Sequence, residues 1–380
     1  MLFFWVFVSC IFRIFPLTSN IHLTNLVFMP FAREVYRVSP RAGSLANMRR
    51  VSETLLDPAP NEVVVEIRAI GLNFADIFAI MGLYSATPKG SFVPGLEYAG
   101  VVIAAGSKVS RVVVGERVMG VIRFGAYATH CMIDENYVLP LPADWSFAEG
   151  AALLVQALTA YYALFPLGAM KHGATVLIHS AAGGVGLVAN RIAKKFQAFT
   201  IGTCGSPHKV PLLNEEGYDR VIIRSEGDNY RAMKQGLADA LRLPDGSQRP
   251  LSLVLDSIGG NTLQASYDAL APTGRVVCFG SAHLAFQGKR PPYLRLGWKY
   301  LQRPKFDPLD MIETNKAVMG FNLIWLWENL AEMHSMIHLL SALHLPKPLV
   351  GHTFPFDELP QAIELFQTGM TMGKVVIEVL

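Results

Sequence analysis

The sequence predicts an α/β fold in which a doubly wound parallel sheet is joined to a second, β-rich unit. Residues 174–190 form a β-branched apolar run, a glycine-rich turn and an apolar run at helical spacing, the pattern of a strand followed by a helix. Apolar runs at 199–203, 251–256 and 274–280 alternate with helical stretches, as in a parallel sheet. Between residues 33 and 154, short strands alternate with turns instead.

Composition sets broad limits on the protein. The 380 residues are 51% hydrophobic and 17% charged, enough to bury two cores, so two domains are expected. The formal net charge of +3 is too small to predict a nucleic-acid partner. The four cysteines, Cys10, Cys131, Cys204 and Cys278, contain no CxxC pair, which argues against a disulfide framework or a structural zinc lobe. This pattern fits a reducing compartment, and a cytoplasmic location is expected.

Residues 1–28 form an atypical apolar leader. The segment Leu2–Phe12 is an apolar run, too short to span a bilayer, and it lacks the basic start and cleavage site of a signal peptide. Three interpretations stay open: a dispensable leader with the working start at Met29, a targeting or membrane-tethering segment, and a packed extension. We expect the fold to begin near residue 30.

The β-rich part opens with a strand at 62–70, which alternates apolar and polar residues at period two. Further apolar runs bounded by glycine follow it. Ser146 and Glu149 form the spacing of a capping box, and they predict one helix that runs through Ala163 and leads into the parallel-sheet domain.

The glycine-rich turn predicts a dinucleotide site. Gly183 and Gly184, beside Ala182 and Val185, would let the backbone turn sharply and approach a pyrophosphate, while Gly186 would let the helix press on the strand. The unpaired N–H groups at the start of the helix would bind the phosphates. A glycine turn can also serve packing alone. The cofactor interpretation is favoured because a second strand follows where such a site places its ribose-recognising residue.

Ordered motifs elsewhere carry a family resemblance. They are Gly71–Asp76, Gly82–Tyr84, Pro94–Gly100, Gly125–Ala128 and Leu158–Tyr161, followed by the glycine turn. With them, the chain from about residue 33 onward resembles the zinc-free quinone oxidoreductase group of the medium-chain dehydrogenase/reductase superfamily. Residues 318–323 and 373–376 most resemble the branch of the synaptic-vesicle membrane protein VAT.

The resemblance implies a specific domain arrangement. A GroES-like β-rich catalytic domain would be built from residues 29–155 and 326–380, and a Rossmann dinucleotide-binding domain from residues 156–325 would be inserted between them. The active cleft would lie between the two domains. The family also leads us to expect a homodimer.

The resemblance also names site residues. It implies that Asn73 and Tyr84 are catalytic, that Thr159 binds the nicotinamide carboxamide, and that Gly280 and Lys374 contact the cofactor. The residues alone leave plainer roles open: a turn residue for Asn73, a half-buried aromatic for Tyr84, and a helix residue bonded to its own backbone for Thr159.

No metal site is predicted. In zinc-dependent relatives the positions matched by Asn73 and Leu96 hold a cysteine and a histidine, and neither an amide nor a leucine serves as a good zinc ligand. Glu97 is therefore expected to be a structural carboxylate. His334 and His338 are spaced for one helix face, but the glutamate of a metalloprotease helix is missing.

The cofactor is predicted to be NADPH. No acidic residue follows the second strand until Glu215, whereas donors and positive charge are present. Ser206 and Lys209 match the pair that binds the 2′-phosphate in the family. Arg224, after the third strand, lies where relatives often place a tyrosine over the same phosphate.

Residues 289–305 interleave six bases with aromatic residues, and no acidic residue lies between Asp268 and Asp307. Such a segment fits a solvated insertion beside the cleft or a peripheral contact with an anionic membrane surface. The leader offers a second route to membrane contact.

The resulting hypothesis is an NADPH-dependent, metal-free oxidoreductase that transfers hydride to a quinone or an α,β-unsaturated carbonyl. The alternative is an NADPH-binding, membrane-associated protein with little catalytic activity. A zinc alcohol dehydrogenase is the third option, disfavoured by the residues at the two ligand positions.

Overall fold

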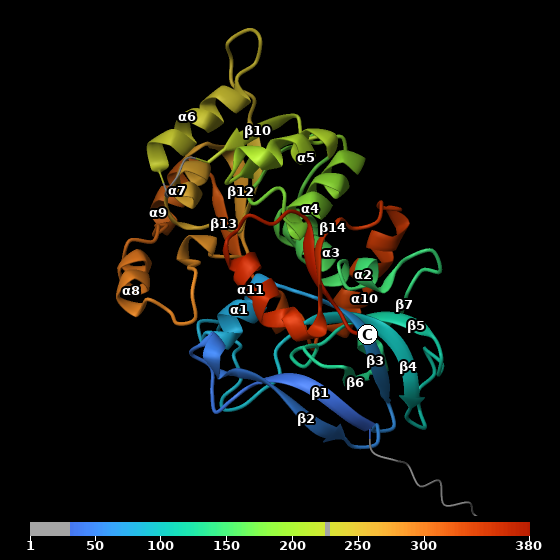
Figure 1. Ribbon diagram of the computed structural model, residues 1–380. Coiled ribbons are helices and arrows are strands. Elements are labelled where there is room, and N and C mark those ends of the chain that lie inside the picture. The colour runs from blue at the N-terminus through green and yellow to red at the C-terminus, as the bar shows by residue number, and fades with distance from the viewer. Residues whose placement is uncertain (1–30, 225–228) are drawn as a thin grey trace, which may run out of the picture.

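The computed structural model describes residues 31–224 and 229–380, which form a β-rich unit and a unit built on a parallel sheet. In Figure 1 the β-rich unit lies at the bottom and the parallel-sheet unit at the top. The predicted apolar leader, residues 1–28, lies outside the described residues.

The parallel sheet has six strands in the order β10-β9-β8-β11-β12-β13. This order reverses at β8, as in a doubly wound dinucleotide-binding fold, and it confirms the predicted fold class. The strands are β8 (Thr175–Ile178), β9 (Phe199–Cys204), β10 (Arg220–Ile223), β11 (Leu251–Asp256), β12 (Leu270–Cys278) and β13 (Ala317–Gly320). The helices are α4 (Gly184–Lys195), α5 (Val210–Glu215), α6 (Tyr230–Leu241), α7 (Gly260–Asp268), α8 (Tyr293–Leu301) and α9 (Pro308–Thr314).

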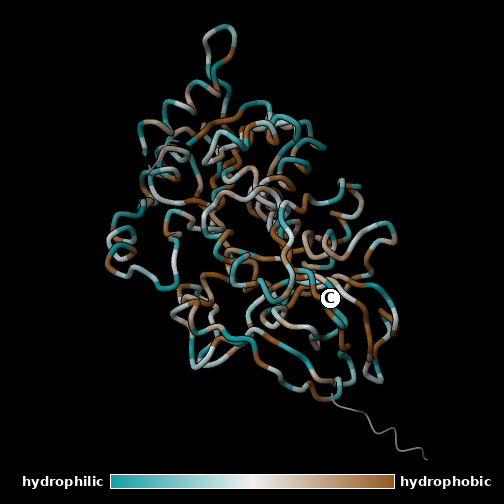
Figure 2. Tube along the Cα trace, in the orientation of Figure 1, coloured by the Kyte–Doolittle hydropathy of each residue, from teal (hydrophilic) through white to brown (hydrophobic). Residues whose placement is uncertain are grey.

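Both faces of this sheet are buried. On β8, Val176 and Ile178 pack against Leu187 of α4 on one face, while Leu177 packs with Leu237 of α6 on the other. Strand side chains alternate between faces, so the continuous apolar run of β8 supplies two separate cores. Figure 2 shows the hydrophobic stretches concentrated in the interior and hydrophilic residues along many outer loops.

The β-rich unit is a seven-stranded mixed sheet with a separate hairpin. Its main path is β14-β15-β3-β4-β5-β7, with β6 also paired to β3. The strands are β1 (Phe31–Val38) and β2 (Met48–Leu55) in the hairpin, then β3 (Glu62–Gly71), β4 (Glu97–Ala105), β5 (Arg117–Val121), β6 (His130–Asp134), β7 (Val138–Pro140), β14 (Val350–Pro355) and β15 (Lys374–Glu378). Helices α10 (Leu330–Ala342) and α11 (Leu359–Gln367) come from the C-terminal part of the chain.

The C-terminal part returns to the β-rich unit, as the family resemblance implied. β15 pairs antiparallel with β3, with Val376 opposite Gly71, and β14 adds to β15 in parallel. The domain boundaries at residues 155/156 and 325/326 stay a prediction.

The helix predicted through Ala163 is interrupted. The capping box is present, because Ser146 N donates to Glu149 Oε2 at 2.6 Å and Glu149 N donates to Ser146 Oγ at 3.1 Å. However, α2 (Phe147–Gly150) ends early and α3 (Leu154–Tyr162) starts anew, so the prediction of one helix was wrong. A buried carboxylate on β4 accepts the N–H of Val155 at 3.1 Å, a group that a continuous helix would bond to its preceding turn.

The stretch Phe147–Leu167 is long and apolar enough to cross a membrane by length and composition. In this fold 61% of its most apolar window is buried inside the protein, as expected for a core helix.

The start of helix α1 (Phe74–Ile80) is capped by the carboxylate of Asp76, which lies inside the β-rich core. Asp76 is fully buried, and its Oδ2 accepts from Asn73 N at 2.8 Å and from the Tyr127 hydroxyl at 3.1 Å. Within the described chain, its Oδ1 has no hydrogen-bond partner. Burial therefore raises the pKa of Asp76 to about 7, although the bond from Asn73 opposes that shift.

Replacing Gly186 by alanine should destabilise the protein. An added Cβ would lie 2.6 Å from Ala181 O, so α4 would have to move away from β8, at a cost of about 1–3 kcal/mol in the free energy of unfolding. Urea denaturation measures this change. Gly297→Ala is the control, because a Cβ there meets nothing within 4 Å. Equal stability of the two variants would contradict the close contact.

Replacing Asp76 by asparagine should weaken the dependence of the free energy of unfolding on pH. The folded pKa of about 7 lies above the ordinary value of 3.8, so the folded state binds more protons than the unfolded state between these values. The contribution of Asp76 to stability is thus present at low pH and is lost as the pH rises toward 7. Chemical denaturation across this range should show the loss in the parent and a smaller loss in Asp76→Asn. An unchanged slope in the variant would show that Asp76 ionises normally.

Candidate active site

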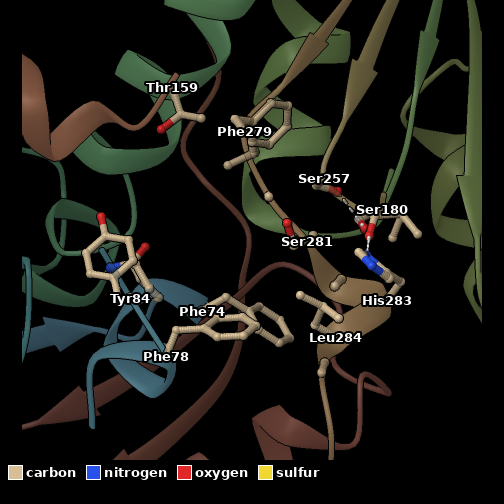
Figure 3. Close-up of a pocket in the computed structure, with 18 of the residues that line it drawn as sticks. Phe74, Phe78, Tyr84, Thr159, Ser180, Ser257, Phe279, Ser281, His283 and Leu284 are labelled. Atoms are coloured by element: carbon tan, nitrogen blue, oxygen red, sulfur yellow. Dashed lines mark hydrogen bonds between the residues drawn. The ribbon is translucent and has the colours of Figure 1, made fainter. Parts of the chain in front are cut away.

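A large cavity of about 2320 Å³ lies between the two units. Pockets for single small ligands usually measure about 300–1,000 Å³, so this volume has room for a dinucleotide and a second molecule. All the predicted site residues except Ser206 line it. Figure 3 shows Tyr84 on the β-rich side, across open space from Ser281 and His283, while the rings of Phe74 and Phe78 reach Leu284.

The glycine turn forms one end of the cavity. The chain reverses at Ser180, which adopts φ of +51°, whereas neither Gly183 nor Gly184 has a positive φ. The turn therefore does not use the left-handed freedom of these two glycines, and their role toward a pyrophosphate stays a prediction. Gly184 also permits close packing, since a Cβ there would lie 2.8 Å from Gln156 Cγ.

Gly186 allows the predicted close packing, because its backbone lies against Ser180 and Ala181 in the turn that follows β8. The predicted turn residues from Ala182 to Gly186 all border the cavity, and the helix α4 begins among them. Backbone N–H groups at a helix start attract anions, so this end of the cavity fits the pyrophosphate of a dinucleotide.

The residues predicted to bind a 2′-phosphate are only partly assembled. Lys209 and Arg224 line the cavity, and Arg224 Nη1 donates to Thr203 Oγ1 at 3.0 Å. Lys209, however, is buried, and its Nζ donates to Gly369 O at 2.6 Å and Thr371 O at 2.8 Å. Burial lowers the pKa of Lys209. The lysine therefore holds residues 368–372, here called the crossover loop.

Ser206 contacts the same loop, with its Oγ 3.5 Å from Met370 Sδ. Gly373, the residue after the crossover loop, meets the glycine turn, because its N donates to Ala182 O at 2.8 Å. Segments far apart in the sequence thus enclose the same end of the cavity.

A buried polar network forms the wall on the β-rich side. Lys374 Nζ contacts Glu97 Oε1 at 2.5 Å and donates to Asn73 Oδ1 at 2.8 Å. Gln156 Nε2 donates to the same two oxygens, at 2.9 Å to Glu97 and 3.1 Å to Asn73. Glu97 and Lys374 are at most 4% exposed, so the charges neutralise each other away from water.

Asn73 is fully engaged in this network. Its Nδ2 donates to Gly71 O at 3.2 Å and to Glu97 Oε1 at 3.0 Å, which uses both amide hydrogens. The side chain reaches the cavity wall, but in this arrangement it has no hydrogen left for a substrate. Its predicted catalytic role stays a prediction.

This donor set does not fit zinc. An amide, the aliphatic Leu96 and a carboxylate already paired with an ammonium group cannot supply the ligands zinc prefers. In the part of the chain that the structure describes, no group of three or more His, Cys, Asp or Glu lies close enough to hold a metal. His334 bonds Asn136 O at 2.8 Å instead.

Tyr84 connects the two units across the cavity. Its hydroxyl donates to Asn322 Oδ1 at 2.6 Å, and burial raises the pKa of the phenol to about 12. Tyr84 follows α1, whereas Asn322 follows β13 of the parallel sheet.

In Figure 3, Thr159 lies on a helix near Phe279. Gly280 follows β12, where a Cβ would meet Ser257 O at 2.8 Å.

Sequence reasoning missed several residues of the site. Gln156 and Asn322 were not assigned roles, and neither was the aromatic wall of Phe74, Phe286 and Phe366. A role for Gln156 could have been recognised from the sequence, because it is a lone amide in an apolar helix. A role for Asn322 could not, since only the folded chain places it beside Tyr84.

Comparison with known proteins agrees with this geometry. Residues 59–143 match the alcohol dehydrogenase GroES-like domain, and residues 217–377 match the zinc-binding dehydrogenase family. The human synaptic vesicle membrane protein VAT-1 homolog is 32% identical over 84% of this chain and 79% of its own length. A quinone oxidoreductase of Pseudomonas aeruginosa is 38% identical over 65% of this chain and 74% of its own.

A solved structure is similar across almost the whole fold. The quinone oxidoreductase of Thermus thermophilus, solved alone and with NADPH, has a TM-score of 0.70 at 26% identity, covering 91% of this chain and 99% of its own. The sheet order, the glycine turn and these relatives agree. The chain therefore belongs to the medium-chain dehydrogenase/reductase superfamily and resembles its quinone oxidoreductases and VAT-1 homologs.

Proposed function

We propose that this oxidoreductase uses NADPH, without a metal, to reduce a quinone or an α,β-unsaturated carbonyl. The observation that carries the proposal is the single cavity that joins the glycine turn to the wall bearing Tyr84 and Thr159. Relatives named quinone oxidoreductases support the reaction class.

The chain offers contacts along the whole length of a dinucleotide. The N–H groups from Gly183 to Gly186 would bind the pyrophosphate, and Thr159 would orient the nicotinamide. Arg224 would bind the 2′-phosphate. Lys209 has a third N–H besides the two used by the crossover loop, so it can add to this contact without releasing the loop. NADPH, when bound, supplies the hydride.

The acceptor determines what the protein must stabilise. Hydride addition to the far carbon of a conjugated carbonyl moves the π electrons toward the oxygen and spreads the negative charge over the conjugated system. The product anion then takes a proton from water. Tyr84 stays protonated because its pKa is about 12, and in this structure its single hydrogen is donated to Asn322 Oδ1. We propose that this O–H turns from Asn322 to the developing anion when the acceptor binds, and that Asn73 acts as a positioning residue through its network.

The alternative, an NADPH-binding protein of membranes with little catalysis, rests on the exposed apolar side chains of α8. We propose a cytoplasmic protein that contacts membranes peripherally. The expected homodimer stays a prediction, which the mass of the protein in solution tests.

Cofactor choice should depend on Arg224. The parent protein should prefer NADPH over NADH, and Arg224→Ala should lower kcat/KM for NADPH about tenfold, because a hydrogen bond to a charged group is lost. The value for NADH should change little. Arg220→Ala, on the same strand segment but with its guanidinium over the Phe199 ring, is the control. Equal use of both cofactors by the parent would count against this assignment.

The reaction should be insensitive to chelators and selective for conjugated acceptors, with negligible oxidation of simple alcohols. Tyr84→Phe should reduce kcat about 100-fold, as expected for removal of one transition-state donor, with little change in cofactor affinity. Tyr36→Phe removes a hydroxyl that bonds Asp357 O outside the cavity, and it should leave kcat unchanged. A requirement for added zinc, or better turnover of alcohols, would refute the metal-free mechanism.

A further inference from the structure

Helix α8 exposes an apolar stripe that no described residue covers. Leu294 is 94% exposed, Trp298 63% and Leu301 68%. Their spacing of four and then three residues puts them on one helix face. Figure 1 places α8 at the outer edge of the molecule, away from the β-rich sheet. A contiguous apolar surface of this kind marks an interaction site.

The charges around the stripe indicate its partner. Lys289, Arg290, Arg295, Arg303 and Lys305 are all exposed, and the sequence has no acidic residue between Asp268 and Asp307. An exposed tryptophan and leucines beside a one-signed basic surface are typical of a helix that lies in the headgroup region of an anionic bilayer. An acidic protein groove would also need complementary shape, whereas a bilayer accepts this convex helix as it stands.

The opposite side of the same helix belongs to the active cavity. Tyr293, Leu296 and Tyr300 line the cavity, whereas Leu294, Trp298 and Leu301 do not. Helix α8 is therefore a wall of the candidate substrate site: one of its faces lines the cavity and another faces the outside. Lys299 Nζ donates to His283 O, which ties α8 to the cavity wall at η5 (Ala282–Leu284).

The cavity near α8 combines an aromatic wall with polar side chains of α8 itself, among them Arg295 and Lys299. In Figure 3, Phe74 and Phe78 from α1 lie beside Leu284 from the segment after β12. Phe286 lines the same space, and the Phe366 ring of α11 lies 4.5 Å from the Phe74 ring. The cavity, at about 2320 Å³, is larger than a pocket for one small ligand usually is. The aromatic wall offers apolar contacts for a chain.

We propose that the substrate is an amphiphile, a quinone or conjugated carbonyl with a long apolar tail, taken up from an anionic membrane surface on which α8 lies. This proposal rests on the proposed function and names the substrate class of that site. The conjugated head reaches the Tyr84 end of the cavity, and the tail lies between α1 and α8.

The test compares two acceptors with the same conjugated head: a short, water-soluble 2-alkenal and a long-chain 2-alkenal carried in vesicles. The vesicles contain phosphatidylcholine with phosphatidylserine, or phosphatidylcholine alone. The full chain should co-sediment with the anionic vesicles only, and it should show higher kcat/KM for the long-chain acceptor in them. The variant Leu294→Glu/Trp298→Glu should lose co-sedimentation and about tenfold or more of the long-chain kcat/KM, with the short-chain value unchanged.

Leu56→Glu is the matched control, because Leu56 is 77% exposed but lies in the β-rich unit away from the cavity. It should change neither vesicle binding nor either rate. Equal long-chain rates in the parent and the double variant, or failure of the parent to bind anionic vesicles, would overturn the role of α8. If the parent protein reduces only the short acceptor, the claim that the substrate has a long apolar tail is overturned, whereas the proposed function is not. No oxidation of NADPH by either acceptor would overturn the proposed function itself, and this inference with it.

Discussion

The buried pair of Lys374 and Glu97 fixes the wall on which the candidate chemistry depends. It joins β15 to β4, and through Asn73 and Gln156 it also holds the start of α1 and the helix α3. Removing one member of such a pair leaves an uncompensated buried charge, which typically costs about 3–5 kcal/mol. The position of α1, and with it of Tyr84 and the aromatic wall, therefore depends on contacts between residues that are distant in sequence.

The same pair bears on the chemistry. A metal at this wall would present a concentrated positive charge to a substrate oxygen. The Lys374 ammonium is already neutralised by Glu97, so the field it projects into the cavity is weak. A wall of this kind suits a reaction in which negative charge is spread over a conjugated system. The energetics of the network and the proposed acceptor class are in this way consistent with each other.

The sequence predicted the elements whose signals are local. The strands of the parallel sheet and the glycine turn were recognisable from periodicity and motifs, whereas the return of the C-terminal part was implied by the family resemblance. Most of the predicted site residues meet in one cavity, although their roles stay predictions. The positive φ of Ser180 was not predictable, because strain at a non-glycine residue is imposed by its surroundings. The break before α3 and the bonds of Lys209 likewise depend on partners brought by tertiary folding.

The pairing of β15 with β3 has a consequence for biosynthesis. Lys374 lies 301 residues after Asn73, and the strands of the parallel sheet all lie between them. While the nascent chain emerges from the ribosome, the Rossmann unit can complete its sheet before β15 exists. During that interval the end of β3, from Ala69 to Gly71, lacks its β15 partner, and the Glu97 carboxylate lacks its ammonium partner. The β-rich unit would then be a ligand for chaperones, and its closure would be among the final steps of maturation.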